Sequence, residues 1–113
     1  MKLTPRQEKL LLDFEPGRRT ELLPEDRVPM RNLVRLGLAV DLGGEGKLTH
    51  EGELTQTVLL TLQHHALKRF TTEGVTDKNH KATLKKAEFI EYSHGFWHLS
   101  DKGKQTAEKL GYL

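Results

Sequence analysis

Apolar residues near the start of the chain recur on one face of a predicted helix. Thr4-Pro5-Arg6-Gln7 has the form of a helix start, with a hydroxyl cap, a proline in the first turn and a glutamine three residues after the cap. Glu15-Pro16-Gly17 ends the helix, because proline disfavours helical conformation before it and glycine supplies a turn. The residues expected on its inner face are Leu3, Leu10, Leu11 and Phe14.

Two further helices and a hairpin are predicted in the first half. A short second helix is expected around residues 20–23, and a third helix is expected to open at Pro29 with Met30, Leu33 and Leu36 inward. Next, Leu38, Val40 and Leu42 alternate with Ala39 and Asp41, which predicts a half-buried strand. Gly43-Gly44-Glu45-Gly46 is expected to turn the chain, and Lys47-Leu48 to return as a second strand.

The second half begins with a long predicted helix over residues 54–70. A helix packed between two units needs a wide apolar face, and this one has it. The residues expected to face inward are Leu54, Val58, Leu59, Leu60, Leu62, His65 and Leu67.

The rest of the second half predicts a helix, a hairpin and a closing helix. Thr76 or Asp77 is expected to cap a helix that turns Leu84 and Ala87 inward. Residues 89–92 and 96–99 are predicted to form a hairpin about a turn at Ser93-His94-Gly95. Ser100 is expected to cap a closing helix that contains Ala107 and Leu110 and stops at Gly111.

The two halves match when the sequence is compared with itself at an offset of 51 residues. Leu33 then falls on Leu84, Leu48 on Leu99, and Gly52 on Gly103. Internal repetition of this kind indicates two similar units, which we place at residues 1–52 and 53–113, the second with a C-terminal helix. We expect both members of each leucine pair to be buried at matching positions.

Composition narrows the class of protein. The chain has 113 residues, 35% of them hydrophobic and 30% charged, which is typical of a soluble globular protein. The absence of cysteine excludes disulfides, thiolate catalysis and cysteine-bound zinc. No window approaches the apolar length of a membrane span, and the start of the chain has no signal-peptide pattern. We therefore expect a cytoplasmic protein that makes no membrane contact.

No metal, cofactor or catalytic site is expected. The loop before Lys47 looks like a phosphate-binding loop, but Leu48 stands where the magnesium-binding Ser or Thr is needed. His64 and His65 are adjacent on a helix and point about 100° apart, so they cannot chelate together. Because no Ser/His/Asp arrangement stands out either, we predict that the protein is not an enzyme.

Charge is concentrated in two places, although the formal net charge is only +2. Residues 27–35 carry three arginines and no acid, and residues 68–86 carry six basic residues against two acidic ones. Such runs favour an anionic partner, but they also occur on ordinary solvated helix faces.

The end of each unit resembles the winged helix-turn-helix superfamily. A helix runs into an apolar strand, a glycine turn follows, and a leucine, a hydroxyl residue and a glycine open the next helix. The matching segments are Leu33-Val34-Arg35-Leu36-Gly37-Leu38-Ala39-Val40 with Leu48-Thr49-His50-Glu51-Gly52, and Leu84-Lys85-Lys86-Ala87-Glu88-Phe89-Ile90 with Leu99-Ser100-Asp101-Lys102-Gly103. The resemblance implies an α+β, mainly helical fold of tandem winged helix-turn-helix units, each with a short two-stranded β-hairpin wing.

In that superfamily the third helix typically enters the major groove of DNA and the wing touches the backbone or the minor groove. Arg and Asn side chains can bind guanine and adenine edges, while lysines and turn amides hold phosphates. The resemblance therefore implies a DNA-binding transcriptional regulator whose partner is double-stranded DNA. The implied contacts are Arg27, Arg31, Asn32, Arg35 and Lys47 in the first unit, and Lys78, Asn79, Lys81, Lys85, Lys86 and His94 in the second.

Two alternatives remain open at the sequence level. A small effector or inhibitor could use the winged-helix scaffold to dock on a larger protein, since residues 1–52 balance nine basic residues with nine acidic ones. RNA binding would use Tyr92, Phe96 and Trp97 as stacking surfaces. We expect those three rings to pack in the core instead. The DNA sequence and the oligomeric state are left open.

Overall fold

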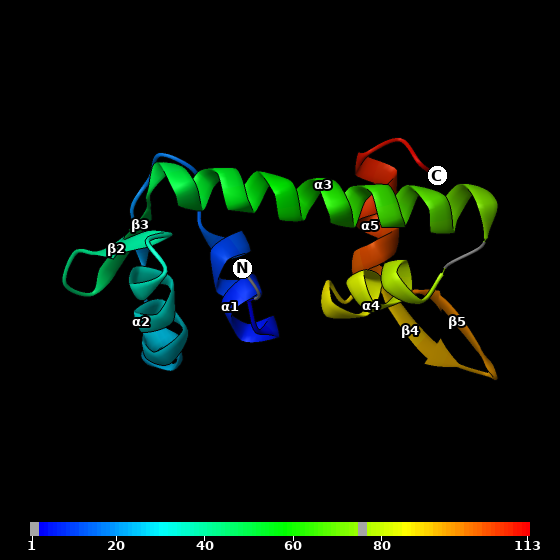
Figure 1. Ribbon diagram of the computed structural model, residues 1–113. Helices are drawn as coiled ribbons and strands as arrows, with labels where there is room; N and C mark the ends of the chain where they lie inside the picture. The colour runs from blue at the N-terminus through cyan, green and yellow to red at the C-terminus, as the bar shows by residue number, and fades with distance from the viewer. Residues whose placement is uncertain (1–2, 75–76) are drawn as a thin grey trace. The chain divides into compact units, whose positions relative to one another are not determined.

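The computed structural model describes residues 3–74 and 77–113. The chain divides into two compact units, Met1–Leu60 and Thr61–Leu113. The boundary falls inside the long helix α3, His50–Glu73, and the boundary predicted after residue 52 also falls inside that helix (Figure 1). The fold is α+β and mainly helical, which confirms the predicted class.

Unit 1 opens with helix α1, Pro5–Asp13, and its start is the predicted capping box. The Thr4 side chain accepts a hydrogen bond from the Gln7 amide at 3.2 Å, and the Thr4 amide donates to the Gln7 side chain at 3.1 Å. The expected inner face is confirmed, because the buried residues here are Leu3, Leu10, Leu11 and Phe14.

The predicted second helix over residues 20–23 is wrong. Strand β1, Thr20–Glu21, pairs antiparallel with β3, Glu45–Leu48, so its backbone is bound to a segment far along the chain. The short 3₁₀ helix η1, Pro24–Asp26, follows, and its Asp26 carboxylate accepts from the Leu23 amide at 3.0 Å. Strand pairing therefore overrides the local helical pattern.

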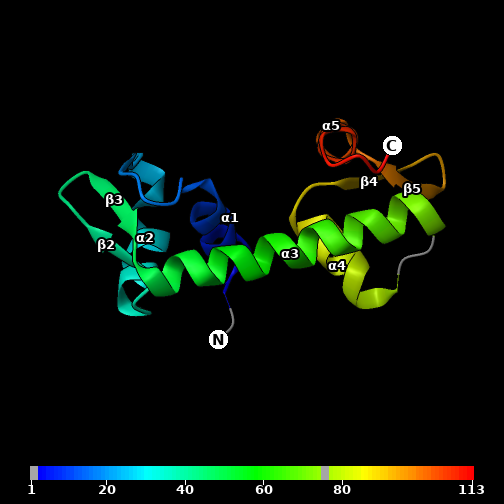
Figure 2. The same ribbon diagram turned by 90° about the horizontal axis from the view of Figure 1, so that it is seen from above.

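Helix α2, Arg27–Arg35, and strand β2, Ala39–Asp41, complete the framework of unit 1. The three strands form one sheet in the order β1-β3-β2, with α2 beside the β2–β3 hairpin (Figures 1 and 2). Met30 and Leu33 are buried as predicted. Leu36 is 40% exposed instead of buried, because the helix ends before it and Gly37 reverses the chain with φ +76°.

The predicted alternation in β2 is also wrong. Leu38 and Ala39 are buried, whereas Val40 and Leu42 are exposed. Leu38 lies in the turn after α2, where its amide donates to the Leu33 carbonyl at 2.9 Å, and it reaches the core before the strand begins. The strand then starts with Ala39 inward, which places Val40 outward.

The end of each hairpin has the same local structure in both units. Thr49 in unit 1 and Ser100 in unit 2 each donate a side-chain hydrogen bond of 2.6 Å, to the carbonyls of Gly37 and Glu88. Their oxygens accept from the amides of Gly52 and Gly103 at 3.1 Å. All three pairs are related by the offset of 51 residues, so the sequence repeat corresponds to a repeated structure.

Helix α3 buries only part of the predicted face. Leu67 is fully buried and Leu59 packs against the core of unit 1, as expected. Leu54, Val58 and Leu62 are 49%, 57% and 54% exposed, and His65 is exposed too. Gln56 is buried instead, and its amide donates to the carbonyls of Leu11 and Phe14 at 2.9 and 2.7 Å. These bonds satisfy carbonyls at the end of α1, which have no partner within their own helix.

Unit 2 contains helix α4, Lys78–Lys86, strands β4, Ile90–Ser93, and β5, Phe96–Leu99, and helix α5, Asp101–Lys109. Asp77 caps α4, as one of the two predicted alternatives; Thr76 lies outside the described residues. Ser100 caps α5 as expected. The buried core consists of Ala66, Leu67, Leu84, Ala87, Phe89, Ile90 and Ala107.

The predicted leucine pairs are confirmed in part. Leu33 and Leu84 are both fully buried, at matching positions in the two units. Leu48 is buried, but Leu99 is only half-buried. Helix α5 ends at Lys109, so Leu110, which was expected inside the helix, is its C-cap residue and is 36% exposed.

Candidate functional site

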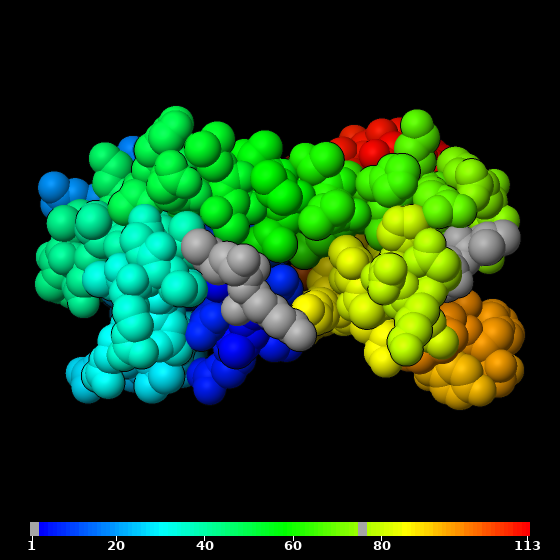
Figure 3. Space-filling view, in the orientation of Figure 1, coloured from blue at the N-terminus to red at the C-terminus, as the bar shows by residue number. Residues whose placement is uncertain are grey.

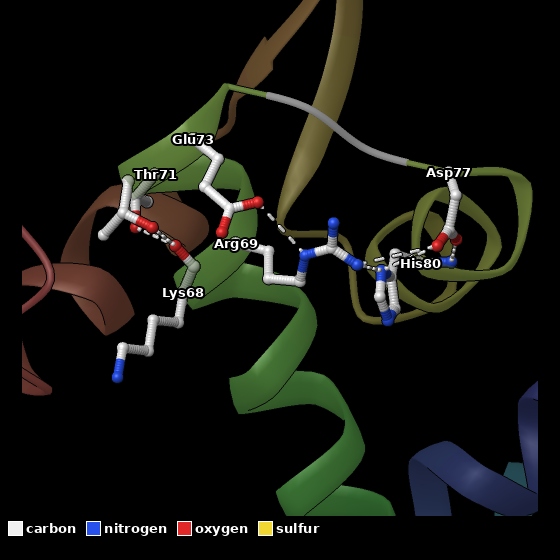
Figure 4. A network of polar contacts seen from close by, with 7 residues as sticks. Lys68, Arg69, Thr71, Glu73, Asp77 and His80 are labelled. Atoms are coloured by element: carbon white, nitrogen blue, oxygen red, sulfur yellow. Dashed lines mark hydrogen bonds and ion pairs between the residues drawn. The ribbon is translucent and has the colours of Figure 1, made fainter.

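A polar network fixes the start of α4 (Figure 4). The Asp77 carboxylate accepts from the His80 amide at 2.8 Å and lies 3.2 Å from His80 Nδ1. The Arg69 guanidinium, from α3, lies 3.7 Å from Asp77 Oδ2 and 3.3 Å from Glu73 Oε2. These contacts join the end of α3 to the first turn of α4 within unit 2.

The same network lowers the pKa of the Asp77 carboxyl below its ordinary value of 3.8. The hydrogen bond from the His80 amide is the largest cause, and desolvation, the next largest, opposes it. The charges of His80 and Arg69 lower the pKa further by smaller amounts. Asp77 is therefore ionised at neutral pH, which suits a carboxylate at a helix N-terminus.

The hairpin of unit 2 exposes two aromatic rings. Its turn, His94-Gly95, has φ +54° and +88°, as a tight two-residue turn requires, and it sets Tyr92 opposite Trp97. Tyr92 and Phe96 are each 60% exposed, so the expectation that they pack in the core is wrong. The reason is that only the Ile90–Leu99 end of the hairpin reaches the core, while Trp97 is half-buried at its edge.

Two lysines of α4 converge on the indole ring of Trp97. Lys81 Nζ lies 4.9 Å and Lys85 Nζ 5.3 Å from the ring centroid, and Tyr92 packs edge-on against the same ring at 5.4 Å. Neither lysine forms an ion pair within residues 3–74 and 77–113. An indole face attracts cations, but two ammonium groups at one ring repel each other, so an anion bound between them would be stabilised.

The other residues of unit 2 that were predicted to contact DNA lie around Lys81, Lys85 and Trp97. Lys78 shares the helix face of Lys81 and Lys85, whereas Asn79 and Lys86 lie on an adjacent face. All of these residues except the half-buried Lys81 are exposed, as is His94 at the hairpin turn. Figure 3 shows α4 and the hairpin tip at the surface, in yellow and orange.

The residues of unit 1 that were predicted to contact DNA do not lie on one surface. Arg27, Arg31 and Arg35 are exposed along one side of α2, and Asn32 is half-buried. Lys47 alternates with the buried Gly46 and Leu48 along β3, so it lies on the sheet face opposite to them. A Cβ on Gly46 would touch Met30 of α2, so α2 covers the Gly46 face. Lys47 and the α2 arginines therefore do not form one surface.

Sequence reasoning missed the role of Trp97 as the partner of Lys81 and Lys85. The lysines were predicted to face outward, and the tryptophan to pack inward. The predicted turn at Ser93-His94-Gly95 is one residue too long, because Ser93 pairs with Phe96. A two-residue turn at His94-Gly95 is the signal that would have placed Tyr92 opposite Trp97, on the same hairpin face.

Comparisons of the chain with protein-family models, with curated protein sequences and with solved structures found no significant match. Within the described parts of the chain, no three His, Asp or Glu side chains are grouped so that they could hold a metal ion. None of the helices described here has both the length and the apolar character needed to cross a membrane. The site's own geometry therefore carries the functional argument.

Proposed function

We propose that the protein is a DNA-binding regulator of the winged-helix type and that unit 2 makes the main contact with duplex DNA. The observation that carries this proposal is the convergence of Lys81 and Lys85 on Trp97 without an acidic partner in the described chain. Phosphate groups are the anions that such a pair would hold, and phosphate contacts set the position of a protein on DNA.

The distribution of charge along the chain also supports unit 2 as the DNA-binding unit. Residues 61–113 contain nine basic and six acidic residues, whereas residues 1–60 contain nine basic and ten acidic ones. A local positive field increases the rate and the strength of binding to a polyanion. The resemblance of the α4–hairpin segment to winged helix-turn-helix proteins also supports it, since α4 then corresponds to the groove-binding helix and β4–β5 to the wing.

The test is the affinity for a labelled mixed-sequence duplex, measured by fluorescence anisotropy between about 50 and 200 mM salt, the range over which phosphate contacts weaken strongly. We expect the Lys81→Ala/Lys85→Ala double variant to bind more weakly than the parent. We also expect the slope of log K against log salt concentration to fall by about 2, because each lost phosphate contact removes about one released counterion. Trp97, the single tryptophan, provides a second signal, because its emission should change when the parent binds DNA.

The matched control is Lys104→Ala/Lys109→Ala, which removes the same charge from exposed positions of α5. This variant should retain most of the affinity. Equal losses in the two double variants would show only a diffuse attraction and contradict a site at Trp97. A parent protein without salt-sensitive affinity near 50 mM salt, where phosphate contacts are strong, would contradict the proposal itself.

A further inference from the structure

Unit 1 has a depression between α2, the segment before it and the β2–β3 hairpin. Its volume is about 540 Å³, within the usual range of ligand-binding sites. The apolar part of its lining includes Leu23, Met30 and Val34, and the polar part includes Arg27, Arg31 and Asp41.

The apolar lining is unusually open to solvent. Leu23 is 53% and Val34 is 40% exposed, whereas Met30 is buried beneath them; Val28, which follows Arg27 on α2, is 62% exposed. Contiguous exposed apolar surface on a small protein is unfavourable in water and marks a contact surface more often than single exposed residues do.

The two arginines of the lining lack a partner, whereas the Asp41 carboxylate accepts a hydrogen bond from the Gly43 amide at 2.9 Å. Arg27 and Arg31 are one helical turn apart on α2, and in the described residues neither side chain forms an ion pair or a hydrogen bond. Asp41 lines the same depression without pairing with either of them. Guanidinium groups bind carboxylates through two parallel hydrogen bonds, so two adjacent arginines favour an acidic occupant.

We propose that this depression docks an acidic amphipathic segment of a partner protein. Its apolar side chains would cover Leu23, Met30 and Val34, and its carboxylates would bind Arg27 and Arg31. Duplex DNA supplies the negative charge but no aliphatic side chains to cover the leucine and valine. This site is additional to the DNA contact of unit 2, and it assigns Arg27 and Arg31 to a protein partner instead of to base edges.

The test uses a phage-displayed library of random peptides, selected in parallel on the full-length parent and on Arg27→Glu/Arg31→Glu. We expect the parent to enrich peptides that combine Leu, Ile or Phe with Asp or Glu. The charge-reversed variant should enrich Lys or Arg in place of the acids. A synthetic peptide from the parent selection should lose affinity on the order of tenfold for each reversed arginine.

Three further variants make the outcome specific. Arg18→Glu/Arg19→Glu reverses two exposed charges elsewhere in unit 1 and should leave the selected peptides unchanged. Val34→Ser should weaken the peptide without changing its charge preference. Lys81→Ala/Lys85→Ala should bind the peptide as the parent does, so that a failure of DNA binding is distinguishable from a failure of docking. The docking proposal is overturned if the parent and Arg27→Glu/Arg31→Glu select the same peptides or select none.

Discussion

A glycine lies in the first turn of the helix after each hairpin, and in both units it allows close approach to a backbone carbonyl. A Cβ at Gly52 would collide with the carbonyl oxygen of Leu38, and a Cβ at Gly103 with that of Phe89. Neither glycine has positive φ, so the requirement is for space and not for an unusual backbone conformation. This explains in physical terms why Gly52 and Gly103 coincide at the offset of 51 residues.

We predict that Gly52→Ala and Gly103→Ala each destabilise their unit, by about 1–3 kcal/mol for overpacking against a backbone that cannot move aside easily. The higher helix propensity of alanine would give the opposite effect at an ordinary helix position. Thermal or urea unfolding measures the difference. Gln105→Ala, at an exposed position of α5, is the control and should change stability little. If Gly103→Ala unfolds at or above the parent temperature, the close approach at Phe89 is not as described.

At the scale of elements, those with local signals could be predicted from the sequence. Thr4, Asp77 and Ser100 cap the helices that follow them, and each cap depends on residues within one turn. Strand β1 could not be predicted, because its conformation depends on pairing with β3. The buried face of α3 was predicted only in part. Leu67 is buried as expected, but Gln56 was missed because carbonyls of α1 hold it inward, and not hydrophobicity.

The candidate site, too, could be predicted only in part from the sequence. The outward lysines of α4 followed from helical periodicity, since Leu84 and Ala87 fix the inner face. Their convergence on Trp97 did not, because it depends on where the hairpin lies beside α4. The depression in unit 1 could likewise not be predicted from the sequence, since β1 and η1 replace the helix that was predicted next to α2.

The Asp77 network predicts a pH-dependent contribution to the stability of α4. Its folded pKa is lowered, so the charge stabilises the folded state above the unfolded pKa, and this stability is lost as the pH falls through the folded pKa. Asp77→Asn retains a capping side chain but removes the charge. We expect this variant to be less stable than the parent at pH 7. The difference should shrink below pH 3.8 and vanish once Asp77 is protonated in the folded state.

Thermal melts of both proteins across this pH range measure the effect, with Trp97 emission reporting on unit 2. Asp13→Asn, an exposed position at the end of α1, is the control for loss of a negative charge. A difference between parent and Asp77→Asn that is constant from pH 7 to the acid limit would show that the ionised carboxylate contributes nothing to the cap.

For the whole molecule, the chain combines two similar frameworks with different surfaces. The hydrogen bonds around Gly52 and Gly103 match, and so do the buried Leu33 and Leu84. The surfaces differ, since unit 2 exposes lysines beside an indole and unit 1 exposes arginines beside aliphatic side chains. The two proposals therefore assign a nucleic-acid contact to one unit and a protein contact to the other.

Each unit has its own hydrophobic cluster, and this predicts that core substitutions act on one unit at a time. Leu33 belongs to the cluster of unit 1 and Leu84 to that of unit 2, and both are fully buried. Truncating a buried leucine to alanine costs about 2–5 kcal/mol, through lost burial and the cavity left behind. We expect Leu33→Ala to increase hydrogen exchange in residues 5–48 while Trp97 emission still reports a folded unit 2. Leu84→Ala should lower the unfolding midpoint reported by Trp97 and increase exchange in residues 78–109, with residues 5–48 protected as in the parent. Equal loss of protection in both units for either variant would show instead that α3 couples them into one cooperative fold.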